Sequence, residues 1–194
     1  MFSVVRDGLD IGFALDRRWR FLRGEMETTK KPALLALARV LAEARVPYAV
    51  IGGVALQIHQ REPRTTLGID VAVPDRARIP TSALESSGFA KTGTFAHLEN
   101  WIGPDQTPVQ FTDDPALASA IGRAVEIDLE STSIRILSVG DLLHEKLRAG
   151  RDPSRRRSKR LQDLADAESL LEQAPALAAE LTADERAVLD RLPK

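Results

Sequence analysis

An apolar run at residues 48–51 that ends directly in the pair Gly52-Gly53 constrains this chain more than any other feature. Pro47 precedes the run, and residues 54–59, Val-Ala-Leu-Gln-Ile-His, follow it with the composition of a helix. Two adjacent glycines permit a sharp turn and a close approach of the backbone to another group. The pattern predicts a strand, a glycine turn and a helix, which indicates an α/β fold class.

The remaining chain divides into a mixed α/β part and a helical tail. Alternation and turn residues predict further strands at residues 69–73, 89–102, 108–111, 125–129 and 134–137, the last two as a hairpin. Helical spacing predicts helices at residues 32–45, 82–87, 115–123, 139–149, 159–172 and 175–192, the last in two pieces. The first 28 residues show weak periodicity and are expected to form a strand or a short helix. We therefore predict an N-terminal extension (1–30), an α/β core (31–137) and a C-terminal helical region (138–194).

Composition narrows the classes of function. The formal net charge of -1 excludes a globally basic nucleic-acid binder, so any such binding needs a local patch. The chain has no cysteine, which excludes disulfides, zinc–thiolate sites and thiol nucleophiles. No segment approaches the ~20 apolar residues that cross a bilayer, and no signal peptide is evident. We expect a cytoplasmic protein without a membrane partner.

A second motif follows the glycine turn. Residues 64–73 read Arg-Thr-Thr-Leu-Gly-Ile-Asp-Val-Ala-Val. Together with residues 48–59, this segment resembles the nucleotidyltransferase superfamily, and most closely its small bacterial members of the abortive-infection and toxin–antitoxin type. That signature is an apolar strand into Gly-Gly or Gly-Ser, a helix, and a strand bearing Asp-x-Asp. The resemblance covers roughly residues 32–171 and implies a nucleotidyltransferase-like mixed β-sheet flanked by helices, with a C-terminal helical region.

The resemblance also implies a site and its cofactors. Gly52, Gly53, Arg64 and Thr66 would bind the phosphates of a nucleoside triphosphate at a helix N-terminus. Two carboxylates two apart on a strand face the same side, where they can hold Mg²⁺ against those phosphates. Asp70 would be one such metal ligand. An active member transfers a nucleoside monophosphate from NTP to a hydroxyl of an RNA, a protein or a small molecule.

The metal motif is incomplete, because the position that matches the first aspartate is Gly68. A third carboxylate usually comes from a neighbouring strand. We favour residues 107–111 for that strand, which puts Gln110 at the metal-facing position; the alternative strand, 125–129, makes Asp128 the third ligand. A lone carboxylate binds Mg²⁺ poorly and cannot hold two ions in a fixed geometry. The sequence therefore predicts an impaired metal site.

Two later segments resemble the helical half of the same relatives. One helix offers Lys146, and the next carries Asp163 and Asp166 on one face. The resemblance implies that Lys146 meets a nucleotide phosphate and that Asp163 or Asp166 orients it. A structural ion pair between packed helices is the competing interpretation, and both can hold.

A dense basic run at residues 151–160 is the last candidate. Arg155, Arg156, Arg157 and Lys159 could contact RNA or nucleotide phosphates, although a solvated loop without a partner is the commoner outcome. Aromatic residues are absent from the neighbouring sequence, which argues against stacking on bases. The two tryptophans, Trp19 and Trp101, are predicted to be packing residues.

Three hypotheses of function follow. We favour a catalytically impaired nucleotidyltransferase-fold protein that binds nucleotide or RNA, or that acts with a cognate protein in a toxin–antitoxin or defence module. The first alternative is an active Mg²⁺-dependent nucleotidyltransferase, for which Asp70, Lys146 and Asp163 would be the catalytic residues. The second is a scaffold without a ligand.

Overall fold

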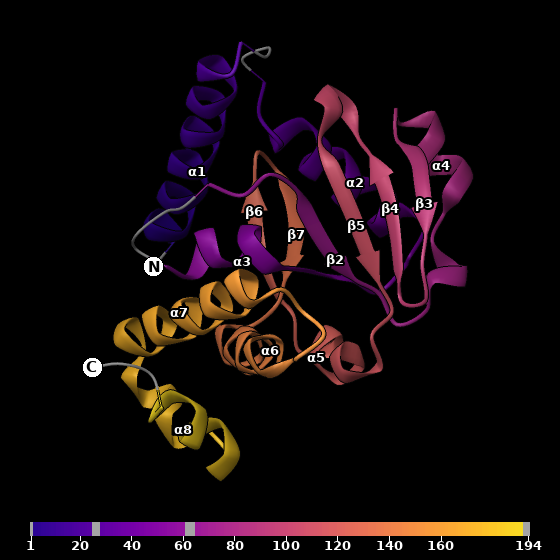
Figure 1. The fold of residues 1–194 in the computed structure, drawn as a ribbon. Helices are drawn as coiled ribbons and strands as arrows, with labels where there is room; N and C mark the ends of the chain where they lie inside the picture. Colours follow the sequence, from indigo (N-terminus) through magenta and orange to yellow (C-terminus); the bar gives the residue numbers. More distant parts are fainter. Residues whose placement is uncertain (1, 25–27, 61–64, 192–194) are drawn as a thin grey trace.

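A mixed β-sheet forms the centre of the molecule (Figure 1). The computed structural model describes residues 2–24, 28–60 and 65–191. Within them the sheet has seven strands in the order β3-β4-β5-β2-β1-β7-β6. The strands are β1 (Ala49–Ile51), β2 (Ile69–Ala72), β3 (Ala90–Thr94), β4 (Leu98–Ile102), β5 (Pro108–Thr112), β6 (Val125–Leu129) and β7 (Thr132–Ile136).

Strand β2 lies near the middle of the sheet and brings three distant segments together. It runs antiparallel to β1, with Ile51 opposite Asp70. It runs parallel to β5, with Asp70 opposite Gln110. The predicted hairpin β6–β7 is present and joins the sheet through a short parallel pairing of β7 with β1. The end of β1 and the middle of β5 therefore flank the same carboxylate.

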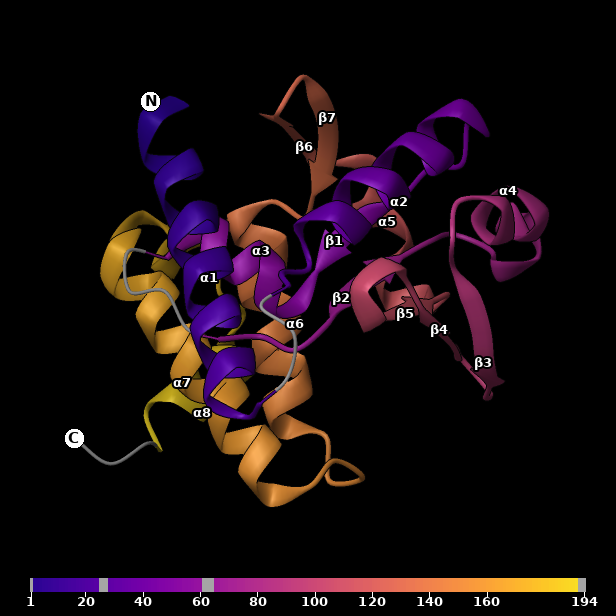
Figure 2. The ribbon, with the colours of Figure 1, turned by 90° about the horizontal axis from the view of Figure 1, so that it is seen from above.

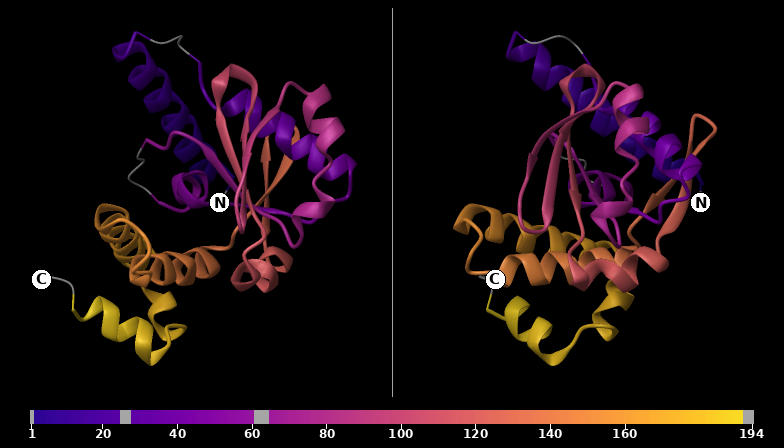
Figure 3. Two further views of the ribbon diagram at one scale, coloured as in Figure 1. Left: turned by 45° about the vertical axis from the view of Figure 1, so that its right-hand side comes forward. Right: turned by 90° about the vertical axis from the view of Figure 1, so that its right-hand side faces the viewer.

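Helices cover both faces of the sheet. Figure 2 shows α2 on one side and α1, α3, α6 and α7 on the other. Helices α6 and α7 lie side by side across one end of the sheet, with α8 beyond them (Figure 3). The helices are α1 (Phe2–Leu22), α2 (Lys31–Glu43), α3 (Gly52–His59), α4 (Thr81–Ser86), α5 (Ala118–Gly122), α6 (Val139–Arg151), α7 (Arg157–Gln173) and α8 (Ala183–Leu189). Short 3-10 helices occupy Arg76–Arg78, Pro104–Gln106, Pro115–Leu117 and Pro175–Ala179.

One apolar cluster joins these layers, from Leu9 in α1 to Leu181 before α8. The predicted α/β class, with a mixed sheet flanked by helices and a helical C-terminal part, is confirmed. The expectation of a strand or short helix at the N-terminus is wrong, because residues 2–22 form one long helix. Its apolar residues Leu9 and Phe13 are only 1% and 4% exposed. Packing against the body, rather than strong periodicity, stabilises this helix.

The contact between α1 and α3 depends on small residues. Gly8 and Gly12 lie one turn apart and both face Gln57 of α3. A Cβ atom on Gly8 would overlap the carbonyl oxygen of Gln57, and one on Gly12 would lie 2.5 Å from the Gln57 side chain. A missing Cβ at these two positions thus lets the two helix backbones approach closely.

The first prediction concerns this contact. Gly8→Ala is expected to lower the free energy of unfolding by about 1–3 kcal/mol, because the new methyl group meets a backbone atom that cannot rotate away. Gly122→Ala is the matched control: it lies at the end of α5 with open space around its Cβ position. Urea denaturation of both variants checks the prediction, and equal stabilities would contradict the close packing of α1 on α3.

None of the helices in the described part of the chain has the length and apolar character that crossing a membrane requires.

Candidate functional site

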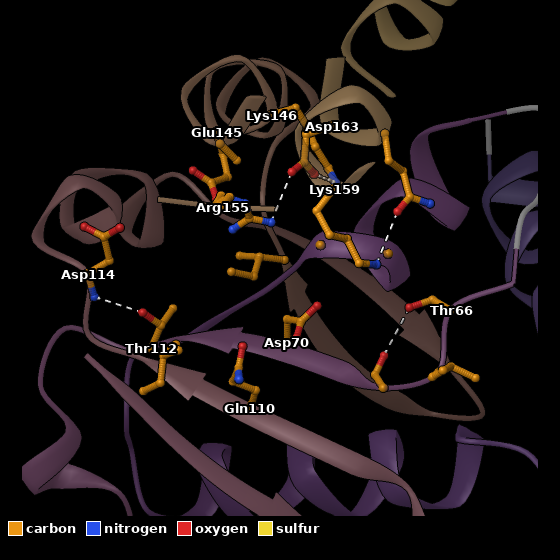
Figure 4. Close-up of a pocket in the computed structure, with 18 of the residues that line it drawn as sticks. Thr66, Asp70, Gln110, Thr112, Asp114, Glu145, Lys146, Arg155, Lys159 and Asp163 are labelled. Carbon is orange, nitrogen blue, oxygen red and sulfur yellow. Dashed lines mark hydrogen bonds and ion pairs between the residues drawn. The ribbon is translucent and has the colours of Figure 1, made fainter. Parts of the chain in front are cut away.

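A cleft of about 680 Å³ lies between the sheet and the pair α6–α7. Figure 4 shows side chains of β2 and β5 on one wall and those of α6 and α7 on the facing wall. The turn from β1 into α3 and residues 65–68 close one end. The cleft therefore gathers segments that lie far apart in the sequence, from Trp19 to Asp163.

Gly52 and Asp70 meet at the floor of this cleft. Gly52 has φ +62°, a conformation that favours glycine, and a Cβ atom there would overlap the carboxylate of Asp70. Gly52 also begins α3, whose N-terminus has no side-chain cap. Backbone N–H groups at an uncapped helix N-terminus favour an anion. The glycine turn thus presents these donors directly beside Asp70.

Thr66 packs on the second glycine. Its hydroxyl occupies the place where a Cβ atom of Gly53 would lie. The Thr66 loop is held from the other side, because the buried ammonium of Lys30 pairs with Asp16 and donates to the Thr66 carbonyl oxygen at 3.2 Å. Arg64, the other predicted phosphate ligand of this loop, lies outside the described residues.

Asp70 stands without a second carboxylate on its own strand or the next. Gln110 is opposite it on β5, and its amide donates to Asn100 Oδ1 on β4 at 2.9 Å. Gly68 lies next to Pro108, whose carbonyl oxygen would be 2.9 Å from an added Cβ. Burial raises the pKa of Asp70, and the nearby Lys146 and the basic run lower it in part. Figure 4 shows Asp70 and Gln110 both pointing into the cleft.

The alternative assignment of Asp128 as the third metal ligand is wrong. It lies on β6, the outermost strand, and β7 and β1 separate that strand from β2. Its register partner is Ser133 on β7, and its side chain is exposed. The favoured assignment, with Gln110 beside Asp70, agrees with the sheet order. In the described residues, no group of three or more His, Cys, Asp or Glu side chains could hold a metal ion.

Lys146 and the acidic face of α7 form a buried network. The Lys146 ammonium lies 2.8 Å from a carboxylate oxygen of Asp163 and 2.8 Å from one of Asp166. All three side chains are at most 8% exposed. Arg155 adds a contact of 3.1 Å to the second oxygen of Asp163 (Figure 4). The predicted ion pair between packed helices is therefore present, and it also forms part of the cleft wall.

The basic run divides into two parts. Arg155 and Lys159 line the cleft, and Lys159 also donates to Gln162 at 3.3 Å. Arg156 and Arg157 are exposed and lie outside the cleft lining. Only some cations of the turn between α6 and α7 and of the first turn of α7 therefore line the cleft.

Three cleft residues were not singled out from the sequence. Arg148 lies 2.7 Å from both Glu145 and Asp114. Asp114 and Glu145 lie on the side of the cleft opposite Thr66 (Figure 4). Burial raises the pKa of Glu145, and Arg148 opposes that shift. Only the helical spacing of Glu145 and Arg148 offered a signal for this pair.

The prediction that Trp19 is a packing residue is wrong. The residue is 46% exposed and lines the cleft. Trp101 agrees with the expectation, at 1% exposure. Amphipathic spacing along α1 does not distinguish a core position from a cleft rim, because the cleft is formed by other elements.

Similar proteins were found among solved structures alone. No protein-family model matches the chain, and no curated protein is significantly similar to it. An antigenic nucleotidyltransferase-like protein from Paracoccidioides brasiliensis has a TM-score of 0.54 and 19% identity, over 84% of this chain and 92% of that one. The antibiotic-resistance factor ANT(2'')-Ia has a TM-score of 0.55 and 18% identity, over 82% and 95%. The lincosamide antibiotic adenylyltransferase LnuA, in its lincomycin-bound structure, has a TM-score of 0.51 and 13% identity. The match covers 73% of this chain and 98% of LnuA.

These likenesses cover most of each chain at low identity. They show that the chain has the nucleotidyltransferase fold, which confirms the fold that the sequence resemblance implied. At this level of identity a shared fold does not establish a shared activity, which has to be argued from the residues of the site.

Proposed function

We propose that this nucleotidyltransferase-fold protein binds a nucleoside triphosphate in the cleft and is catalytically impaired. The observation that carries the proposal is the uncapped N-terminus of α3 at Gly52, which faces the cations of Arg155 and Lys159 across the cleft. Backbone donors and two cations on opposite walls suit a chain of phosphates. This arrangement of donors and cations supports the proposal that the cleft binds a nucleotide.

The residues around Asp70 do not fit the two-ion Mg²⁺ site that the fold family implies. Mg²⁺ requires near-octahedral oxygen ligands and is usually held by one or two carboxylates and the substrate phosphates. Here the neighbouring positions offer Gly68, which has no side chain, and Gln110, a neutral side chain whose amide nitrogen donates to Asn100 Oδ1. Burial further disfavours the charged form of Asp70. A two-metal transfer therefore lacks its ligands, and we derive no step through a metal.

Calorimetric titration with each of the four NTPs, with and without Mg²⁺, tests the proposal. We expect binding of NTP that changes little when Mg²⁺ is removed. Lys159→Gln is expected to weaken NTP binding about tenfold, because a charge-assisted contact to phosphate is lost. Arg157→Gln is the matched control in the same basic run, since its side chain lies outside the cleft. Absence of heat with every NTP would support the scaffold alternative and reject our proposal.

RNA is a second candidate ligand, because Arg156 and Arg157 extend the positive charge beyond the cleft. A ligand that reaches past the cleft would release more counterions on binding, so its affinity would fall more steeply with salt. Arg157→Gln separates the two ligands: it should weaken the binding of a single-stranded RNA and leave NTP binding unchanged.

Two further proposals rest on the sequence resemblance alone. One is a cognate protein partner in a cytoplasmic toxin–antitoxin or defence module, which co-purification with the product of a neighbouring gene would test. The other is the active alternative, in which Asp70, Lys146 and Asp163 are catalytic. LnuA is an adenylyltransferase, so labelled ATP is the natural probe. Transfer of label by the native protein would reject catalytic impairment.

A further inference from the structure

Trp19 combines a fixed position with an exposed ring. Asp16, one turn earlier on α1, pairs with the buried Lys30, and Phe13 packs in the core at 4% exposure. Both contacts anchor the helix within the two turns that precede Trp19. The indole nevertheless remains 46% exposed. An aromatic ring that is held in place and left open to solvent is suited to contact with a ligand.

The ring lies close to the phosphate-binding elements. Trp19 lines a small hollow with Thr65, Thr66 and Leu67, and this hollow adjoins the main cleft. The hydroxyl of Thr66 lies against Gly53 at the N-terminus of α3. Thr66 and Trp19 line both the hollow and the main cleft. Leu67 is 69% exposed and adds a second apolar group at the same rim.

The cleft therefore has an aromatic and apolar rim next to cations and backbone donors. A ligand that matches both parts carries a flat ring joined to a chain of anionic groups. Other exposed apolar residues of α1, such as Phe21 and Leu22, do not line the cleft. This restriction to the rim favours a nucleotide over a protein surface that would cover the whole helix.

We infer that Trp19 is the platform on which the base of the bound nucleotide stacks, while its phosphates lie at Gly52-Gly53, Arg155 and Lys159. The inference rests on the proposed nucleotide binding and adds the part of the site that holds the base. Stacking on an indole accepts any base, because each has a π-face. The four NTPs should accordingly bind with similar affinity.

Calorimetry with ATP and with inorganic tripolyphosphate tests the inference. Trp19→Ala should weaken ATP binding about tenfold, since one base–aromatic stack is lost, and leave tripolyphosphate binding unchanged. Trp19→Phe should recover most of the ATP affinity, because it restores a flat ring. Phe21→Ala is the control: this aromatic residue of α1 is 49% exposed and lies outside the cleft lining. Its ATP affinity should equal that of the native protein.

Tryptophan fluorescence provides an independent readout. The chain has two tryptophans. Trp101 is shielded, with its indole N–H donating to Glu99 at 2.8 Å. A saturable change of emission with ATP, absent with tripolyphosphate and absent in Trp19→Phe, would support stacking.

The possible failures are distinguishable. Equal ATP affinity of Trp19→Ala and the native protein would overturn the stacking role while nucleotide binding stands. Loss of tripolyphosphate binding in Trp19→Ala would assign Trp19 a structural role and also overturn it. No binding of ATP or tripolyphosphate to the native protein would overturn the proposed function itself.

Discussion

Replacing Lys146 with methionine is expected to lower the free energy of unfolding by about 3–5 kcal/mol. The ammonium lies 2.8 Å from both Asp163 and Asp166, and all three groups are buried. Methionine fills a similar volume, so the cost arises from two buried carboxylates that lose their shared cation. Arg155 contacts only Asp163, and it is 43% exposed, so it compensates little.

Chemical denaturation monitored by circular dichroism measures this effect. Lys159→Met is the matched control, because Lys159 is an exposed lysine one turn before Asp163 on α7. This variant should change the free energy of unfolding by no more than about 0.5 kcal/mol. A triple variant, Lys146→Met with Asp163→Asn and Asp166→Asn, removes the whole charge network and should recover part of the loss. If Lys146→Met alone is as stable as the native protein, the network does not join α6 to α7.

The second large effect is a gain of metal binding. Gln110→Asp places a carboxylate opposite Asp70 on the neighbouring parallel strand. We expect Mg²⁺ affinity to rise about tenfold, because affinity for hard cations follows the number of charged oxygen ligands. Gly68→Asp would add the missing member of the motif, but its Cβ lies 2.9 Å from the Pro108 carbonyl oxygen, so it requires a shift of β5. The single Gln110 variant is therefore the cleaner first step.

Calorimetry with Mg²⁺ and an assay for transfer from labelled NTP measure the gain. Adding Asp70→Asn to Gln110→Asp should abolish it, which controls for charge placed elsewhere in the cleft. Mg²⁺ affinity that is unchanged by Gln110→Asp would show that the two positions do not share an ion. Strong Mg²⁺-dependent transfer by the native protein would contradict the impaired metal site.

Local sequence patterns predicted the individual turns and helix faces of the site. They did not predict which strands lie next to one another in the sheet. Adjacent residue types predict the turn at Gly52-Gly53, and spacing on one helix predicts that Asp163 and Asp166 share a face. The pairing of Lys146 with Asp163 came from the family resemblance. The choice between Gln110 and Asp128 needed the strand order. Both residues lie on strands of similar composition, and pairing between distant strands leaves little trace in either one.

The role of Trp19 shows the same limit more clearly. The neighbouring sequence of the basic run contains no aromatic residue, which argued against base stacking. In the folded chain, α1 packs on α3 and brings Trp19 to the cleft that Arg155 and Lys159 line. Bringing segments more than a hundred residues apart to one cleft depends on helix packing, which proximity in the sequence does not report.

By itself, then, the amino-acid sequence determined the α/β class, the turn at Gly52-Gly53, and the basic run and acidic helix face of the helical tail. Each of these follows from periodicity or from residue types a few positions apart. Tertiary structure alone decided that Gln110 rather than Asp128 lies opposite Asp70, that residues 2–22 form a helix, and that Trp19 lines the same cleft as Gly52. The physical reason is that strand order and helix docking minimise the exposed apolar surface of the whole chain. The sequence of a single segment does not determine this total surface.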